Sequence, residues 1–88
     1  MRIRLSTSYL RALEKFIKNN KNRSDKVRKT LTIFKNNPNY PSLHLEKLSG
    51  SEFWTIRTDK GNRIFFSWID KSTALFIDIG KHDKYRRY

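Results

Sequence analysis

The stretch Asn62-Arg63-Ile64-Phe65-Phe66-Ser67-Trp68-Ile69 decides the fold, together with the stretch Leu75-Phe76-Ile77-Asp78-Ile79-Gly80-Lys81-His82-Asp83 that follows it. In the first stretch Ile64, Phe66 and Trp68 alternate with other residues, so they share one face of a strand. Lys71-Ser72 suits a two-residue turn. The pattern therefore predicts a hairpin in which Trp68 pairs with Leu75, Phe66 with Ile77 and Ile64 with Ile79.

A further strand, ending near Arg57, precedes this hairpin. A two-residue turn between the strands would bury the charged Arg63 in the apolar face. A three-residue loop, Asp59-Lys60-Gly61, instead pairs Ile56 with Ile64 and Arg57 with Arg63. We expect this loop, with Gly61 supplying the positive φ of a bulge.

The N-terminal half reads as a short strand, Arg2 to Leu5, and two helices. Ser6, Thr7 or Ser8 caps the first helix, and Ser24 with Asp25 begins the second, which ends at Asn36-Asn37-Pro38. The expected inward positions are Tyr9, Leu10, Leu13, Phe16, Ile17, Val27, Leu31 and Phe34. Residues 38–52 read as an irregular link. The prediction is a single α+β domain, residues 1–88, ordered βααβββ, with a two-helix hairpin packed on one face of a small, mainly antiparallel sheet.

The charge is strongly positive. Lys and Arg number 20 against 8 acidic residues, a net charge of +12. The first 40 residues carry 11 basic and 2 acidic side chains, so the helical half is the more cationic. Such a chain attracts nucleic acid, and its positive charge would equally attract an acidic protein partner.

Several classes of function are disfavoured. There is no cysteine, and the two histidines lie 38 positions apart, so we expect neither a metal nor another cofactor. No run approaches the length of a membrane span, and the N-terminus lacks the apolar run of a signal peptide. We expect no membrane partner and a cytoplasmic location.

One face of the predicted sheet is polar. Alternation puts Arg57, Arg63 and Asp78 on it, with His82 if the last strand continues that far. Two guanidinium groups and an imidazole can handle a phosphate. The alternative is that both arginines are ordinary solvated residues held by Asp78. Phe65, on the same face, either stacks on a nucleotide or shields the sheet.

The ordered set of segments resembles the RelE/ParE superfamily of toxins from bacterial type II toxin–antitoxin pairs. The resemblance covers most of the chain and rests on the two basic helices and on these segments: Pro41-Ser42-Leu43-His44-Leu45-Glu46-Lys47-Leu48-Ser49-Gly50, Trp54-Thr55-Ile56-Arg57, Asn62-Arg63-Ile64-Phe65-Phe66, and Asp78-Ile79-Gly80-Lys81-His82-Asp83-Lys84-Tyr85-Arg86. It implies a toxin neutralised by a cognate acidic antitoxin. In the RelE-like branch it implies a ribosome-dependent mRNA endoribonuclease, and in the ParE-like branch a non-enzymatic inhibitor of DNA gyrase.

Within the nuclease branch, the matching positions imply Glu46 as general base, Arg63 as the contact to the scissile phosphate and His82 as general acid. His44 is an alternative base or a packing residue, and Glu46 either acts as the base or pairs with a lysine. Further RNA-binding or phosphate-binding candidates are His44, Lys47, Arg57, Lys60, Lys81, Tyr85, Arg86 and Tyr88. The implied partners are mRNA, the ribosome and the antitoxin. A plain RNA-binding module or an inactivated toxin is a further hypothesis.

Overall fold

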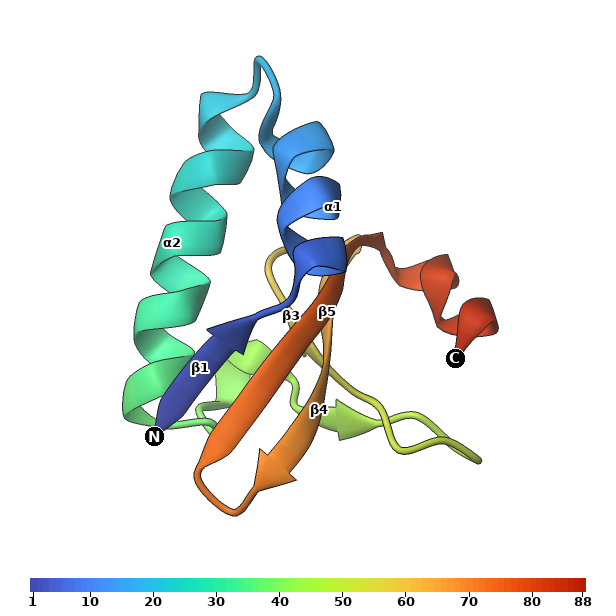
Figure 1. Cartoon of the computed structure of the whole chain (residues 1–88). Helices are drawn as coiled ribbons and strands as arrows, with labels where there is room; N and C mark the ends of the chain where they lie inside the picture. Colours follow the sequence, from blue (N-terminus) through green and yellow to red (C-terminus); the bar gives the residue numbers. More distant parts are fainter.

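The structure, a computed structural model, describes residues 1–88 (Figure 1). The strands are β1 (Arg2–Leu5), β2 (Glu46–Lys47), β3 (Trp54–Arg57), β4 (Asn62–Asp70) and β5 (Thr73–Lys81). The helices are α1 (Thr7–Ile17) and α2 (Lys21–Asn36), and two 3-10 helices are η1 (Pro41–Leu43) and η2 (His82–Arg87).

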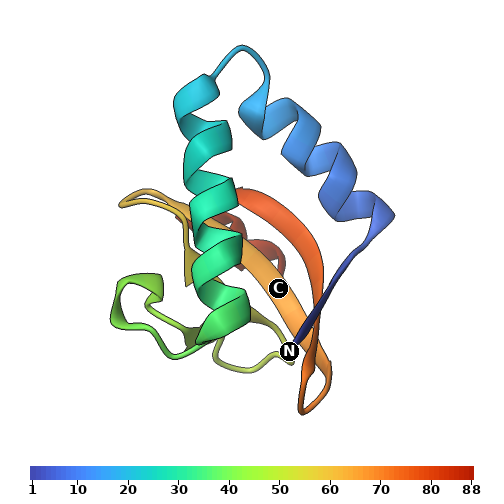
Figure 2. The ribbon, with the colours of Figure 1, turned by 90° about the vertical axis from the view of Figure 1, so that its left-hand side faces the viewer.

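The five strands form one sheet in the order β1-β5-β4-β3-β2. Strand β1 runs parallel to β5, and the other neighbours are antiparallel. The α1–α2 hairpin covers one face of the sheet (Figure 2). The predicted α+β class and the helix hairpin on one sheet face are confirmed. The fifth strand, β2, lies within the segment that was predicted to be irregular.

The core lies between the helices and the sheet. The Phe34 ring of α2 lies 5.1 Å from the ring of Phe66 and 5.8 Å from the ring of Phe76, measured between centroids. Tyr9 of α1 meets Phe76 edge to face at 5.3 Å. The predicted inward position of Leu10 is wrong, since this side chain is 48% exposed. The buried core residues are Tyr9, Phe16, Val27, Phe34, Leu43, Ile56, Ile64, Phe66, Ala74, Phe76 and Ile79.

Both helices begin at side-chain caps. The Ser6 hydroxyl accepts a hydrogen bond from the Tyr9 amide at 3.0 Å, as the sequence predicted for this region. Helix α2 begins at Lys21, three residues before the predicted start, because the Asn20 side chain accepts from the amide of Arg23 at 3.0 Å. Its end at Asn36 agrees with the prediction.

The predicted β3–β4 register is confirmed, with Ile56 opposite Ile64 and Arg57 opposite Arg63. The predicted positive φ at Gly61 is wrong, since Gly50 is the only glycine of the chain with a positive φ. Instead, the Asp59 carboxylate shapes the loop by accepting from the amides of Gly61 and Asn62 at 3.0 and 3.1 Å.

The β4–β5 hairpin has the expected two-residue turn at Lys71-Ser72, and Ile64 lies opposite Ile79. Its remaining register is wrong in the prediction: Phe66 lies opposite Phe76, and Trp68 opposite Ala74. Irregularities between Phe65 and Phe66 and between Trp68 and Asp70 shift the pairing. They turn the large Phe76 ring, rather than Leu75 and Ile77, fully into the core.

The second face of the sheet is less open than predicted, because the C-terminal segment folds back over it. Phe65 is fully buried, and the ring of Tyr88 lies 5.3 Å from its ring. The Phe53 ring lies 5.0 Å from Tyr88. Phe65 therefore packs beneath the chain terminus.

Candidate active site

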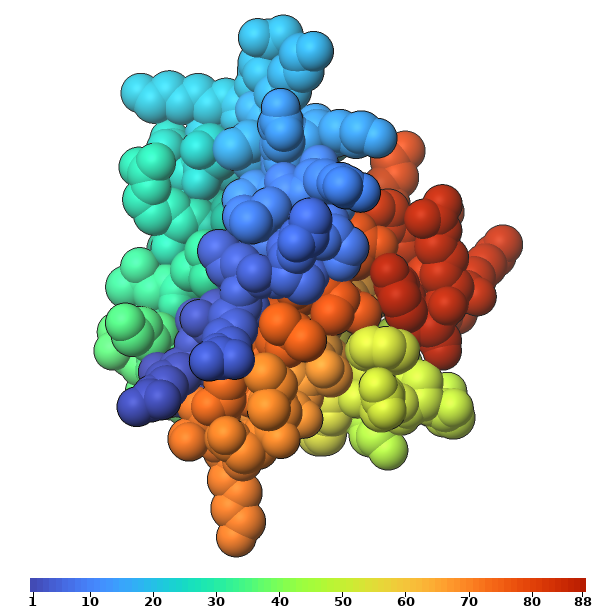
Figure 3. Space-filling model, viewed as in Figure 1, coloured from blue at the N-terminus to red at the C-terminus, as the bar shows by residue number.

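The three residues predicted to be catalytic line one hollow of about 350 Å³, although they are far apart in the sequence. Glu46 comes from β2, Arg63 from β4 and His82 from the start of η2. In Figure 3, η2 (red) lies beside the segment around β2 and β3 (yellow) on the same side of the molecule. The other residues of the lining are Lys47, Leu48, Ser49, Thr55 and Tyr85.

Arg63 is the half-buried cation of this hollow. Its guanidinium donates to the backbone carbonyl oxygens of Asn62 at 3.2 Å and Asp59 at 3.4 Å. Burial lowers the pKa of Arg63 and neighbouring Arg57 lowers it further, while Glu46 and Asp59 act in the opposite direction. The side chain nevertheless stays cationic at neutral pH. No carboxylate lies within 4.0 Å of it, so its charge is available to an anion.

His82 is exposed and begins η2 immediately after β5 ends at Lys81. Its backbone amide donates to the carbonyl oxygen of Gly61 at 3.0 Å, which ties η2 to the β3–β4 loop. No hydrogen bond or ion pair joins Asp83 to the imidazole. The ring is therefore free to meet a substrate from the solvent side.

Glu46 lies on the exposed edge strand β2, opposite Thr55 of β3. It forms no salt bridge with Lys47 or with a helix lysine, so a purely structural ion pair is not its role here. His44, the alternative base, does not line the hollow. It takes a left-handed conformation, φ 47°, and closes η1 through an amide hydrogen bond to Pro41.

A buried carboxylate anchors η2. Asp78, 6% exposed, accepts from the Lys84 ammonium at 3.0 Å and from the Tyr88 hydroxyl at 2.9 Å. Burial, followed by this hydrogen bond to Asp78, raises the pKa of Tyr88 to about 12. The alternative in which Asp78 holds the two arginines is wrong, because Asp78 is bonded to Lys84 and Tyr88 instead. Lys84 lies over Gly80, where an added Cβ would stand 2.8 Å from its side chain.

The other predicted binding residues are divided between several places. Lys47 and Tyr85 share the hollow with Arg63, whereas Arg57 and Lys60 line a separate hollow beside α2. Lys81 and Arg86 are exposed outside both hollows. Tyr88, a predicted RNA-binding residue, packs on the sheet.

Sequence reasoning did not single out Thr55, Leu48 and Ser49 as parts of the site. Thr55 is 4% exposed and lines the hollow on the strand that carries Arg57. Its place on the polar face was readable from the alternation of that strand. The contributions of Leu48 and Ser49 depend on how the chain turns after β2, for which the sequence held no comparable signal.

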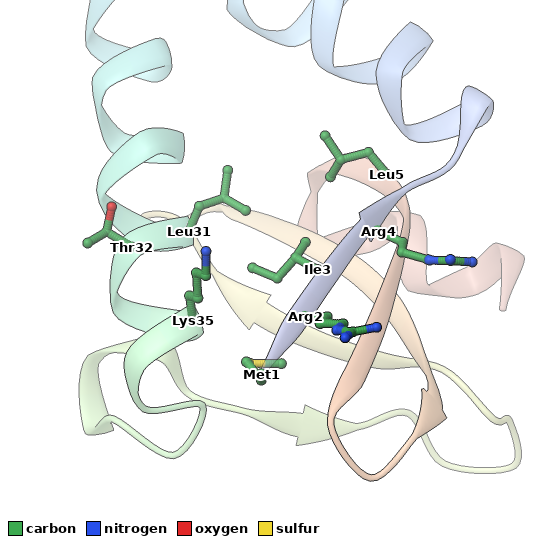
Figure 4. A pocket seen from close by; sticks show the side chains of 8 residues that line it. All are labelled: Met1, Arg2, Ile3, Arg4, Leu5, Leu31, Thr32 and Lys35. Atoms are coloured by element: carbon green, nitrogen blue, oxygen red, sulfur yellow. The ribbon is translucent and has the colours of Figure 1, made fainter.

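A larger groove, of about 570 Å³, lies elsewhere, between the free edge of β1 and helix α2 (Figure 4). Its apolar side chains are Met1, Ile3, Leu5 and Leu31, and its cations are Arg2, Arg4 and Lys35. We refer to it as the β1–α2 groove.

The structure offers neither a metal-binding cluster nor a membrane-spanning helix. No group of three or more His, Cys, Asp or Glu side chains is placed to hold a metal ion. Neither helix has the length and apolar character that crossing a membrane requires.

No family model matches the sequence, and no curated protein matches it. Solved structures do resemble the fold. A YoeB/ParE toxin from Agrobacterium tumefaciens superposes with a TM-score of 0.76 at 16% identity, over 93% of this chain and 99% of that one. The YoeB-YefM toxin-antitoxin complex from Staphylococcus aureus gives 0.72 at 18% identity, over 93% and 97%.

The DinJ-YafQ complex from E. coli gives a TM-score of 0.72 at 17% identity, over 96% of this chain and 97% of that one. The likeness therefore covers nearly the whole length of every one of these chains. The chain has the fold of the YoeB and YafQ toxins.

Proposed function

We propose that this protein is the toxin of a type II toxin–antitoxin pair and that it cleaves mRNA on the ribosome, in the cytoplasm. The observation that carries the proposal is the meeting of Glu46, Arg63 and His82 in one hollow. A carboxylate, a cation and an imidazole are the groups that RNA cleavage by its own 2′-hydroxyl needs.

The reaction assigns one role to each side chain. Glu46 accepts the proton of the 2′-hydroxyl, and the freed oxygen attacks the adjacent phosphorus to form a 2′,3′-cyclic phosphate. Arg63 stabilises the negative charge that develops on the phosphate oxygens. His82, as the imidazolium, donates its proton to the departing 5′-oxygen. One bond forms between the 2′-oxygen and phosphorus, and the bond between phosphorus and the 5′-oxygen breaks.

Primer extension on mRNA in a translating bacterial extract tests the nuclease. Wild-type protein should produce discrete cuts at ribosome-positioned codons. His82→Ala and Arg63→Ala should each reduce cutting by roughly 10²-fold or more, since a general acid or a charge-stabilising group supplies about that factor. Lys71→Gln, a surface change in the β4–β5 turn, is the matched control and should cut like wild type. Undiminished cutting by both site variants would refute these roles.

Gyrase inhibition is the alternative, and the same preparation addresses it. A gyrase inhibitor of this fold would block supercoiling in vitro and leave mRNA intact. We expect normal supercoiling with the toxin in excess. Growth arrest on induction would in turn exclude a plain RNA-binding module or an inactivated toxin.

We propose the β1–α2 groove as the binding site of the acidic antitoxin. Its apolar floor suits the alternate side chains of an extended segment, and the outer edge of β1 is free to pair with a strand. Arg2, Arg4 and Lys35 supply charges that favour an acidic sequence. The charge reversal Arg4→Glu should weaken the affinity of the antitoxin and reduce the salt dependence of binding. An unchanged affinity would show that the antitoxin does not bind in this groove.

A further inference from the structure

A second cationic hollow lies between α2, η1 and the β3–β4 loop and holds about 490 Å³. We call it the Arg57 hollow. Its cations are Lys26 and Lys29 of α2, Arg57 of β3 and Lys60 of the loop, and its only acid is Asp59. Four cations and one carboxylate leave a net charge of +3 around one concavity.

Two polar atoms of this hollow are buried without partners. Neither the Arg57 Nε nor the Thr58 Oγ1 has a hydrogen-bond partner, and both are shielded from solvent. Buried donors are usually satisfied, and leaving one unpaired costs about 1–3 kcal/mol. Both residues line the same hollow, so a side-chain movement that exposes these two groups would let an anion bound there accept from both.

The neighbouring charges do not neutralise Arg57. Arg57 lies directly opposite Arg63 on the adjacent strand, and no carboxylate lies within 4.0 Å of either. Like charges in this position repel. The one acid of the hollow, Asp59, is already held by Lys26 at 3.9 Å and by hydrogen bonds from Asn62 and Gly61.

We infer that the Arg57 hollow is a phosphate-binding subsite for an RNA strand, separate from the scissile position at Arg63. The inference rests on the proposed function for the identity of the strand. Arg57 and Arg63 are cross-strand partners, so an RNA strand bound at Arg63 lies next to the strand that carries Arg57. Lys29, Lys60 and the Thr58 hydroxyl complete its donors.

Nuclear magnetic resonance can observe this subsite directly. Inorganic phosphate is titrated into ¹⁵N-labelled protein at constant ionic strength, and the Arg57 Nε–H and Thr58 amide signals are followed. We expect both to shift and saturate, and Arg57→Gln to abolish the Thr58 response. Shifts that spread evenly over surface lysines and never saturate would overturn the inference.

Binding of a fully 2′-O-methylated RNA hexanucleotide, which has no 2′-hydroxyl to attack, gives the second readout. Arg57→Gln and Lys29→Gln should each weaken binding about fivefold and reduce the slope of log affinity against log salt by about one, as expected for a lost phosphate contact. Lys71→Gln removes the same charge outside the hollow and should change neither quantity. Equal losses of affinity in all three variants would show that the RNA is held only by the general positive charge of the protein, and would overturn the inference.

The outcomes separate the subsite from the nuclease. Saturable phosphate and hexanucleotide binding at Arg57, in a protein that cuts no mRNA, would support the subsite and refute the proposed function. His82-dependent cutting with wild-type binding by Arg57→Gln would do the reverse.

Discussion

Arg57→Gln should make the protein more stable while it weakens phosphate binding. The change removes one of two like charges that face each other across β3 and β4. It also removes a buried Nε that lacks a partner. Cross-strand charge pairs contribute roughly 0.2–1 kcal/mol, and part of the aliphatic stem is kept. We expect the free energy of unfolding to rise by about 0.5–1 kcal/mol at low ionic strength.

Phosphate should reverse the order of the two proteins. A ligand that binds only the folded state stabilises it by RT ln(1 + [L]/Kd), or about 1.4 kcal/mol at a phosphate concentration tenfold above Kd. Arg57→Gln should lack this gain. Phosphate also stabilises proteins by exclusion from their surface. The gain in stability that phosphate gives the variant measures this exclusion effect alone. The difference between the gains of the two proteins therefore measures specific binding.

Urea unfolding, followed by the fluorescence of Trp54 and Trp68, measures both effects. The two proteins are compared in sodium chloride and in sodium phosphate of equal ionic strength. A variant that is less stable than wild type in chloride would show that Arg57 is a structural residue. An equal gain from phosphate in both proteins would show that the hollow holds no specific anion.

Three further changes test other parts of the structure by urea unfolding. Lys84→Met should lower the free energy of unfolding by about 2 kcal/mol, because it removes a charge-assisted hydrogen bond from buried Asp78; a loss below 0.5 kcal/mol would contradict the anchor. Tyr9→Phe should raise it by about 1 kcal/mol at pH 7, because the hydroxyl is buried without a partner. Burial raises the pKa of Tyr9 to about 12, so wild type should lose stability as the pH rises from 10 to 12, and the variant should lose less. At Asp59, burial alone would raise the pKa, but hydrogen bonds from Asn62 and Gly61 and the charge of Lys26 together hold it below the usual value. Asp59→Ala should therefore cost about 1 kcal/mol at pH 7, and this difference should disappear as the pH falls through the lowered pKa.

The sequence predicts the β3–β4 register because the alternatives differ greatly in energy. A shift of one residue would bury the charge of Arg63, and only the observed register puts Ile56 opposite Ile64. The same reasoning failed for β5. Leu75, Phe76 and Ile77 are all apolar, so either face of that strand can be the buried one. Phe76 is the residue that faces the core because its ring packs against Tyr9 and Phe34 of the α1–α2 hairpin, and this fit depends on three-dimensional shape.

The candidate site was only partly readable for a related reason. Alternation along β3 and β4 correctly places Arg57 and Arg63 on one sheet face. Which hollow each of them lines depends on the path of η1 and on how α2 packs beside the β3–β4 loop. The anchoring of η2 by Asp78 and Lys84 depends on where β5 ends, and strand alternation holds no information about that point.

The geometry also sets a length for the antitoxin segment that could inhibit the site. The β1–α2 groove lies at the first strand of the sheet order, and Glu46 lies on the last, four strand spacings away. At about 4.8 Å per spacing, the path along the sheet between the two strands is about 19 Å. An extended chain covers about 3.3 Å per residue, so roughly six residues beyond the groove are needed to reach the site. A segment confined to the groove would leave Arg63 and His82 open to RNA. Neutralisation by blocking the site from this groove therefore requires a partner that also crosses the sheet.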